Sequence, residues 1–476
     1  MSQRPGRGSL RVALMIVTFG GVAALLAQPP AEAPTLVIEA ARVITATGAP
    51  PIVDGAVVVT GNRISYVGPR ASRPATGQAQ VIRLANGTVL PGFIDSHVHF
   101  RPWMTKLFIQ FGVTTLLDTG NPTDVILRER DRLSKAPTTL SRLFVVGQGI
   151  SGKLPGEPAG NERLLTTGAE TAAATRELLD ASVDAIKVHN WMPPALLTPI
   201  TTEAHRANRP VLGHLGVNAA IAIESGLDVL VHSYGLDLAT NDDPAVRAEI
   251  ERRMPEYQAR TEYYPSHLMD PRNYGRVIAV MMAHHAYFNP TFQSQFRGFL
   301  HEAPAYDAYD RIVYDQIAPA FPEITNVKDV LPYYSAPQSH PASDAQRREI
   351  EDGMRKVALF MKQFSEAGGR LVAGTDTSRL GLPGLRLHRE IELWVRNGIK
   401  PMEAIRGATQ YSAQMLRHEE LGTLAAGKVA DLLLVEGDPL KDITVTKNIV
   451  DVVKDGHLVT LVPVPRETPG SLAGVR

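Results

Sequence analysis

The chain has 476 residues and carries 49 basic and 49 acidic side chains, so its formal net charge is zero. A balanced charge gives no overall field that attracts nucleic acid or an anionic membrane, and such partners are disfavoured. The length exceeds what one small core uses and predicts one large domain with a smaller one. Cysteine is absent, which excludes disulfides and a cysteine-linked lipid anchor.

The N-terminus has the pattern of an export signal. Arg4, Arg7 and Arg11 precede an apolar run over residues 12–27, and small residues follow in Ala31-Glu32-Ala33. We expect a signal peptide over residues 1–33 and cleavage after Ala33. The mature chain would then be secreted or periplasmic, with no stable membrane insertion. The alternative is an uncleaved anchor, although the run is shorter than the ~18 apolar residues of a typical span.

Two terminal segments share a sequence pattern that is typical of short β-strands separated by turns. One covers residues 34–90, with strands expected at 35–40, 55–59 and 63–68, and the other covers 420–465, with strands expected at 430–435 and 449–456. We predict that both segments join into one small β-sandwich domain.

Residues 91–419 alternate short apolar strands with helical stretches, which is typical of repeated βα units around a parallel sheet. Eight strands are expected, at residues 92–97, 113–118, 143–147, 184–188, 210–214, 228–232, 286–290 and 370–374. Eight strands in an α/β chain of this length predict a closed (β/α)8 TIM barrel, with an open doubly wound sheet as the alternative. Residues 241–284 and 293–368 are longer than one helix requires and are expected to cover the barrel mouth.

The first of these strands ends in Asp95-Ser96-His97-Val98-His99. Alternate side chains of a strand point to the same face, so His97 and His99 can reach one point in space. Imidazole is a common ligand of zinc and similar cations, and the pair therefore predicts half of a metal site.

Further candidate ligands stand at the ends of other predicted strands: Lys187, His214, His232 and Asp376. Each alone has an ordinary structural explanation, such as a snorkelling lysine, a core histidine or a helix cap. Active sites of closed barrels lie where the carboxyl ends of the strands meet. Six candidate ligands on five strands therefore predict a metal centre at the barrel mouth.

Two neighbours of these ligands are ambiguous. Tyr234 follows His232 by two residues and, if the strand continues, would share its face and could donate a hydrogen bond to a substrate carbonyl. Packing at the barrel rim is the competing interpretation. His189 stands two residues beyond Lys187 and has the same two interpretations.

Three segments, residues 89–99, 373–376 and 422–432, resemble the amidohydrolase superfamily, especially its secreted prolidase-like and imidazolonepropionase-like members. The resemblance implies that Lys187 is converted to N6-carboxylysine by carbon dioxide and bridges two divalent metal ions. One metal would take His97, His99 and Asp376, and the other His214 and His232. Zinc is the first expectation, with manganese, cobalt and iron as alternatives.

The function that follows is a secreted binuclear metal-dependent amidohydrolase that cleaves a C–N bond in an amide, dipeptide or cyclic amide. A hydroxide between the metals would attack the carbonyl, with Asp376 as general base and then general acid. An ester, lactone or phosphotriester hydrolase on the same site is an alternative. A mononuclear deaminase is another, against which Lys187 argues because deaminases of this superfamily generally lack a bridging lysine. A non-catalytic binding protein is a third alternative.

The expected partner is a small-molecule amide or peptide, and nothing in the sequence indicates an oligomeric state. Several residues of the long insertions and loops could hold a substrate carboxylate, among them Tyr264, Arg297, Arg379 and Arg386.

Overall fold

The computed structural model describes residues 36–152, 162–259, 265–296, 300, 303–325, 343–377 and 382–467. The expected signal peptide and its cleavage site lie outside these residues. Among the helices of the described ranges, none combines the length and the hydropathy of a membrane span.

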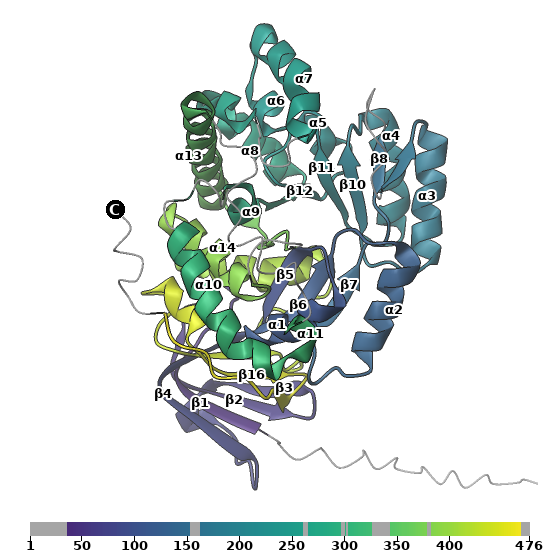
Figure 1. The fold of residues 1–476 in the computed structure, drawn as a ribbon. Helices are drawn as coiled ribbons and strands as arrows, with labels where there is room; N and C mark the ends of the chain where they lie inside the picture. The colour runs from purple at the N-terminus through teal and green to yellow at the C-terminus, as the bar shows by residue number, and fades with distance from the viewer. Residues whose placement is uncertain are drawn as a thin grey trace, which may run out of the picture.

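The middle of the chain forms the predicted barrel of parallel strands (Figure 1). The first strand, β5, is buried along its whole length, as is its neighbour β6. Strands covered on both faces favour continuous apolar sequence, as in Val229-Leu230-Val231. The eight barrel strands are β5 (Phe93–Val98), β6 (Val113–Asp118), β7 (Arg142–Val145), β10 (Ile186–Asn190), β11 (Val211–Leu215), β12 (Val229–Val231), β13 (Tyr287–Asn289) and β14 (Arg370–Leu371).

Backbone hydrogen bonds close the ring at two places outside the regular ladders. The amide of Asp184, just before β10, donates to the carbonyl of Val145 on β7 at 2.8 Å. On the other side, the amide of Ser96 on β5 donates to the carbonyl of Ala373, just after β14, at 2.9 Å. The first and last strands are therefore neighbours, and the doubly wound alternative is wrong.

Two short strands that the sequence analysis did not predict extend the third strand of the barrel. These are β8 (Ile150–Gly152) and β9 (Arg163–Leu165), and β8 pairs in parallel with the carboxyl half of β10. Gly147, with φ of +70°, lies between β7 and β8 and allows the chain to bend there.

Helices surround the strands and cover the mouth (Figure 1). The long helix α13 begins with a capping box between Ser343 and Gln346 and buries an apolar stripe that includes Val357 and Phe364. The helices are α1 (Thr105–Gln110), α2 (Thr123–Ser134), α3 (Gly168–Asp180), α4 (Pro194–Arg206), α5 (Ala219–Glu224), α6 (Leu236–Thr240), α7 (Pro244–Ala259), α8 (Tyr274–Ala283), α9 (Phe292–Phe296), α10 (Ala303–Ile317), α11 (Pro322–Thr325), α13 (Asp344–Glu366), α14 (Leu385–Arg396), α15 (Pro401–Gly407) and α16 (Gln410–Met415).

Both terminal segments join into one domain, as the sequence predicts, and its strands form a single hydrogen-bonded sheet of seven strands in the order β17-β16-β15-β4-β1-β2-β3. All its pairings are antiparallel except β1 with β4. In Figure 1 this terminal sheet lies beneath the barrel. Its strands are β1 (Leu36–Val43), β2 (Ile52–Thr60), β3 (Arg63–Pro69), β4 (Gln80–Pro91), β15 (Leu432–Glu436), β16 (Ile449–Lys454) and β17 (His457–Leu458).

A network of charges joins the terminal sheet to the amino end of the barrel strands. Arg142, the first residue of β7, lies 2.8 Å from a carboxylate oxygen of Asp431 and 3.0 Å from one of Asp455. Lys454 at the end of β16 is buried and forms ion pairs with the same two carboxylates. Burial alone would raise the pKa of Asp431, but the charges of Lys454 and Arg142 lower it below its ordinary value.

We expect Asp431→Asn to destabilise the folded chain by about 3 kcal/mol at pH 7, because it removes one of the two carboxylates that Arg142 and Lys454 share in a buried network. A carboxyl whose folded pKa is lowered contributes stability above its unfolded pKa of ~3.9 and loses it as the pH falls through the folded pKa. The difference between wild type and variant should therefore shrink below about pH 4. Thermal melting across pH measures it.

The exposed pair of Asp124 with Arg128 provides the control for this prediction. Asp124→Asn should leave the melting temperature close to that of the wild type, because exposed ion pairs contribute little to stability. An equal loss in both variants, or a loss in Asp431→Asn that does not depend on pH, would contradict the assigned role of the network.

Candidate metal centre and active site

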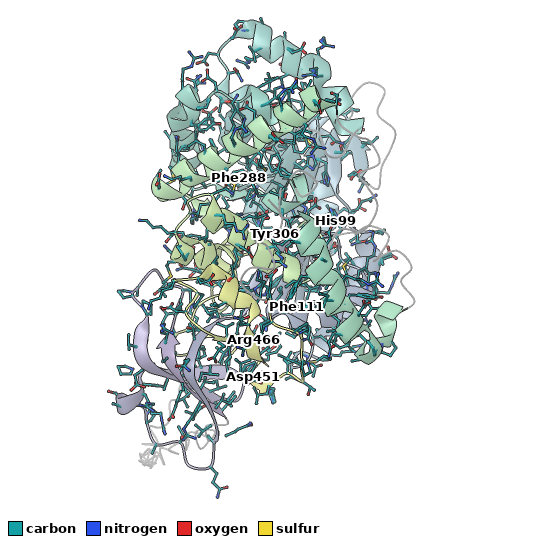
Figure 2. The ribbon with its side chains drawn as sticks, turned by 60° about the vertical axis from the view of Figure 1, so that its left-hand side comes forward. His99, Phe111, Phe288, Tyr306, Asp451 and Arg466 are labelled. Atoms are coloured by element: carbon teal, nitrogen blue, oxygen red, sulfur yellow. The ribbon has the colours of Figure 1, made fainter. Side chains whose placement is uncertain are left out.

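The barrel brings the predicted ligands of the first and last strands together. The Nε2 atoms of His97 and His99 lie 3.5 Å and 3.2 Å from Oδ1 of Asp376. Two ligand atoms of a tetrahedral zinc with bonds of about 2.1 Å are about 3.4 Å apart, so these spacings suit one cation. His97 is buried, whereas His99 and Asp376 are partly exposed at the mouth. Figure 2 shows His99 in the barrel part of the molecule, away from Asp451 in the terminal sheet.

His214 and His232 form the adjoining side of the cluster. Their ring centroids are 4.7 Å apart, and the ring of His232 lies 5.2 Å from that of His97. Single ligand atoms of His97, His232 and Asp376 all lie within 4.8 Å of one another. The four histidines and Asp376 therefore form one continuous group of donors.

Lys187 lies inside this group on β10, only 1% exposed, and its Nζ atom has no hydrogen-bond partner among the described residues. Burial lowers its pKa to about 7, against the opposing charges of Asp376 and Glu162. A buried amine of this kind is available in its neutral form, which is the nucleophilic form of lysine. An ammonium here would lower the pKa of every histidine around it: His97, His99, His189, His214 and His232.

Tyr234 lies at the mouth, but not for the reason that the sequence suggested. The strand does not continue through it, because β12 ends at Val231 and His232 has φ of +59°. The ring of Tyr234 instead stacks on that of His214, with centroids 4.0 Å apart, and is 6% exposed. Its position beside a candidate ligand is compatible with both interpretations, contact with a substrate and packing at the barrel rim.

His189 belongs to the same cluster. Parallel pairing of β10 with β11 places it directly beside His214, and the two ring centroids are 5.5 Å apart. Its Nδ1 atom lies 3.8 Å from a carboxylate oxygen of Glu162. By contrast, His388 is buried in the scaffold, where its Nε2 atom hydrogen-bonds to the carbonyl of Phe111.

A second group of residues supports the ligands from below. The carboxylate of Asp95 accepts hydrogen bonds from the amides of His97 and Thr375 and from the Thr375 hydroxyl, and it thereby joins β5 to the segment after β14. Burial raises the pKa of Asp95 to about 7. Gly374 lies against this junction, and a Cβ there would come 2.6 Å from the Cβ of His97.

Sequence reasoning missed two hydroxyl residues that contact the ligands. Thr291, two residues after β13, lies 2.5 Å from Nδ1 of His232 through its Oγ1 atom. Ser294 on α9 donates to Oδ2 of Asp376 at 3.1 Å. The position of Thr291 could have indicated this contact, because it follows the seventh barrel strand as candidate ligands follow other strands.

Arg386 is not available to bind a substrate carboxylate. Its side chain is fully buried, and Nε donates to Oε1 of Gln293 at 3.2 Å, so it belongs to the scaffold rather than to an open surface. Tyr264, Arg297 and Arg379 lie outside the described residues.

The donor set fits divalent cations by its chemistry. Four imidazoles and one carboxylate are ligands that zinc and related metals accept, and the orphaned amine of Lys187 is placed where a bridging anion would complete the set. Burial raises the free energy of such a polar cluster unless each member has a partner, and a cation supplies one.

The comparisons with known proteins agree with this geometry. Residues 88–459 match the Amidohydrolase family, and the chain belongs to that family. A solved Xaa-Pro dipeptidase with bound methionine is 20% identical, with a TM-score of 0.63 over 89% of this chain and 99% of that chain. A prolidase complexed with N-methylphosphonate-L-proline is 19% identical, with a TM-score of 0.61 over 90% of this chain and 99% of the other.

Among curated proteins, an imidazolonepropionase of Pseudomonas fluorescens is 48% identical over 48 residues. That match covers 10% of this chain and 12% of the relative, so the chain matches only a small part of that protein's length. The family match thus assigns the chain to the Amidohydrolase family, and the solved structures share its fold.

We expect Gly374→Ala to disturb the metal centre, because the added methyl group meets His97 and Asn289 in a packed core. Such overpacking costs about 1–3 kcal/mol and should displace the His97 ring. Thermal melting and metal content by mass spectrometry measure the two effects. Gly275→Ala is the matched control, since a Cβ there meets nothing within 4 Å. Wild-type metal content in Gly374→Ala would contradict the supporting role of this glycine.

Proposed function

We propose that this protein is a binuclear metal-dependent amidohydrolase that cleaves a C–N bond in a small amide, a dipeptide or a cyclic amide. The observation that supports it best is the buried Nζ atom of Lys187, which lies amid five histidines and Asp376 and has no hydrogen-bond partner in the described part of the chain. A lysine in that position is unfavourable as an ammonium and serves no visible structural purpose as an amine.

Addition of carbon dioxide to the neutral amine would make Lys187 an N6-carboxylysine. The new carbamate carries a negative charge and two oxygen donors, so it would compensate two cations where an ammonium would repel them. His97, His99 and Asp376 would hold one metal, and His214 and His232 the other. Zinc suits this mixture of nitrogen and oxygen ligands best, and manganese, cobalt or iron would also accept it.

When bound, the two cations would polarise the substrate carbonyl and lower the pKa of water to about 7. Asp376 would take a proton and return it to the leaving nitrogen. Its Oδ1 atom faces His97 and His99, and its Oδ2 atom accepts a hydrogen bond from Ser294. The hydroxyl of Tyr234, on the ring that stacks on His214, is our candidate for a hydrogen bond to the substrate oxygen.

Amides and dipeptides are favoured over other substrates by the family and by the dipeptidase and prolidase folds that the chain resembles. Esters, lactones and phosphotriesters can be hydrolysed by the same donor set and form the second candidate class. A mononuclear deaminase is less favoured, because it would leave Lys187 without a role.

The test is a substrate panel of acyl amino acids, Xaa-Pro dipeptides, cyclic amides, esters and phosphotriesters, assayed for amine, ammonia and acid release. We expect amine and acid in equal amounts, and loss of activity after a chelator with recovery on adding zinc. Lys187→Met and Asp376→Asn should each reduce kcat by at least about 1,000-fold, which corresponds to about 4 kcal/mol of lost transition-state stabilisation.

Arg417→Ala is a control at a distance from the site, since its partner Asp228 precedes β12 at the amino end of the barrel. It should keep the wild-type rate, and circular dichroism should show that all three variants are folded. Ammonia as the sole product would replace the amide proposal with deamination. Full activity in Lys187→Met would refute the binuclear mechanism.

We also propose that the protein is exported and acts outside the cytoplasm. The proposal rests on the arginine-led apolar run over residues 12–27 and the small residues before Pro34. N-terminal sequencing of the protein from cells that express the full chain should find a new terminus at Pro34. An intact Met1 in a membrane fraction would support the uncleaved anchor instead.

A further inference from the structure

The short helix α9 follows the seventh barrel strand and contacts two candidate ligands. The seventh strand itself supplies no candidate ligand. The helix follows β13 after two residues and lies beside α14. Its residues and the preceding Thr291 contact His232 on one side and Asp376 on the other. These two ligands would belong to different metals, so one segment reaches both halves of the centre.

The hydroxyl of Thr291 contacts one of the two ring nitrogens of His232. Its oxygen lies 2.5 Å from Nδ1, and both groups are buried. If Nδ1 carries the hydrogen and donates it to the hydroxyl, Nε2 keeps its lone pair for a cation. The side chain would then set both the tautomer and the orientation of the ring.

Thr291 is held in an unfavourable backbone conformation. Its φ is +41°, which is rare for a β-branched residue, and His232 and Asp376 have φ of +59° and +51°. Such conformations persist only where the surroundings impose them, and they concentrate at functional sites. One residue after each of the sixth, seventh and eighth strands therefore has a positive φ, and all three residues lie around the cluster.

Ser294 performs the matching task for Asp376. Its hydroxyl donates to Oδ2 at 3.1 Å, whereas Oδ1 faces the two histidines of the first strand. The carboxylate is thus restrained from both sides and presents one defined oxygen to each neighbour. Without this bond it could rotate about its Cβ–Cγ bond.

The helix itself is fixed by a buried carboxylate on α14. Glu390 accepts hydrogen bonds from the amides of Phe292 and Gln293, both at 2.7 Å, and from Nε1 of Trp394 at 2.9 Å. On the far side, Oε1 of Gln295 accepts a hydrogen bond from Ser233, the residue after His232. The segment is therefore anchored at both ends and can hold a side chain still.

We infer that residues 291–296 form a clamp on the metal centre, in which the hydroxyls of Thr291 and Ser294 are positioning groups that set His232 and Asp376 for metal binding. This inference rests on the proposed function for the presence of the metals, but not for the identity of the substrate. The clamp acts through two ligands, one for each metal.

The experiment is a zinc titration of the metal-free protein in competition with a chromophoric chelator, together with kcat and KM on any substrate found. Thr291→Ser keeps the hydroxyl and Thr291→Ala removes it, so this pair isolates the oxygen. Ser294→Thr and Ser294→Ala form the second pair. We expect each alanine variant to lower the affinity for one zinc per chain by about 10- to 100-fold, with the hydroxyl variants close to wild type. In each alanine variant kcat should fall while KM stays unchanged.

Two buried hydroxyls elsewhere provide the controls. Ser141 donates to the carbonyl of Val113 at 2.7 Å, and Thr175 to that of Thr171 at 2.8 Å. Ser141→Ala and Thr175→Ala should leave zinc affinity unchanged.

The clamp is overturned if the alanine and hydroxyl variants bind zinc alike at both positions, or if the controls lose as much affinity. A wild-type chain that binds two zinc ions but hydrolyses no amide would refute the proposed function alone, because the zinc affinities of the variants would still test the clamp. A wild-type chain that binds no zinc would refute both.

Discussion

The burial of Lys187 among histidines is the constraint on which the rest of this site depends. The amine of Lys187 is 1% exposed and has no hydrogen-bond partner within the ranges that the structure describes, which is unfavourable unless the site supplies a compensating group. The barrel creates the situation, because parallel strands direct their carboxyl ends to one mouth and so concentrate polar side chains there. The surrounding fold has to hold this cluster open and in place.

That support comes from residues that are not themselves candidate ligands. Asp95 joins the first strand to the last, Gly374 leaves room for His97, and the segment after the seventh strand contacts ligands of both sides. Hydrogen bonds from an outer layer usually set the tautomer and the orientation of metal-binding side chains. The strained backbone at His232, Thr291 and Asp376 shows where this outer layer overrides local preference.

The terminal sheet has a different task. It contacts the amino end of the barrel through Arg142, Asp431 and Lys454, away from the mouth. Stability and chemistry therefore occupy opposite ends of the strands, as is usual in barrels of this kind. A change in the charge network can lower stability without touching the donors.

The sequence by itself determined the eight barrel strands, the pairing of the terminal segments and the six candidate ligands. Periodicity and the position of polar residues at strand ends are local signals, and the motif around His97 adds a family resemblance. Only the tertiary structure decided the surroundings of Tyr234, Arg386, Thr291 and Ser294. The position of Tyr234 depends on the left-handed conformation of His232, directly after β12. The burial of Arg386 depends on its contact with Gln293 of α9. Thr291 and Ser294 act on partners 59 and 82 residues away in the chain, and contacts at that separation leave no mark in a single sequence.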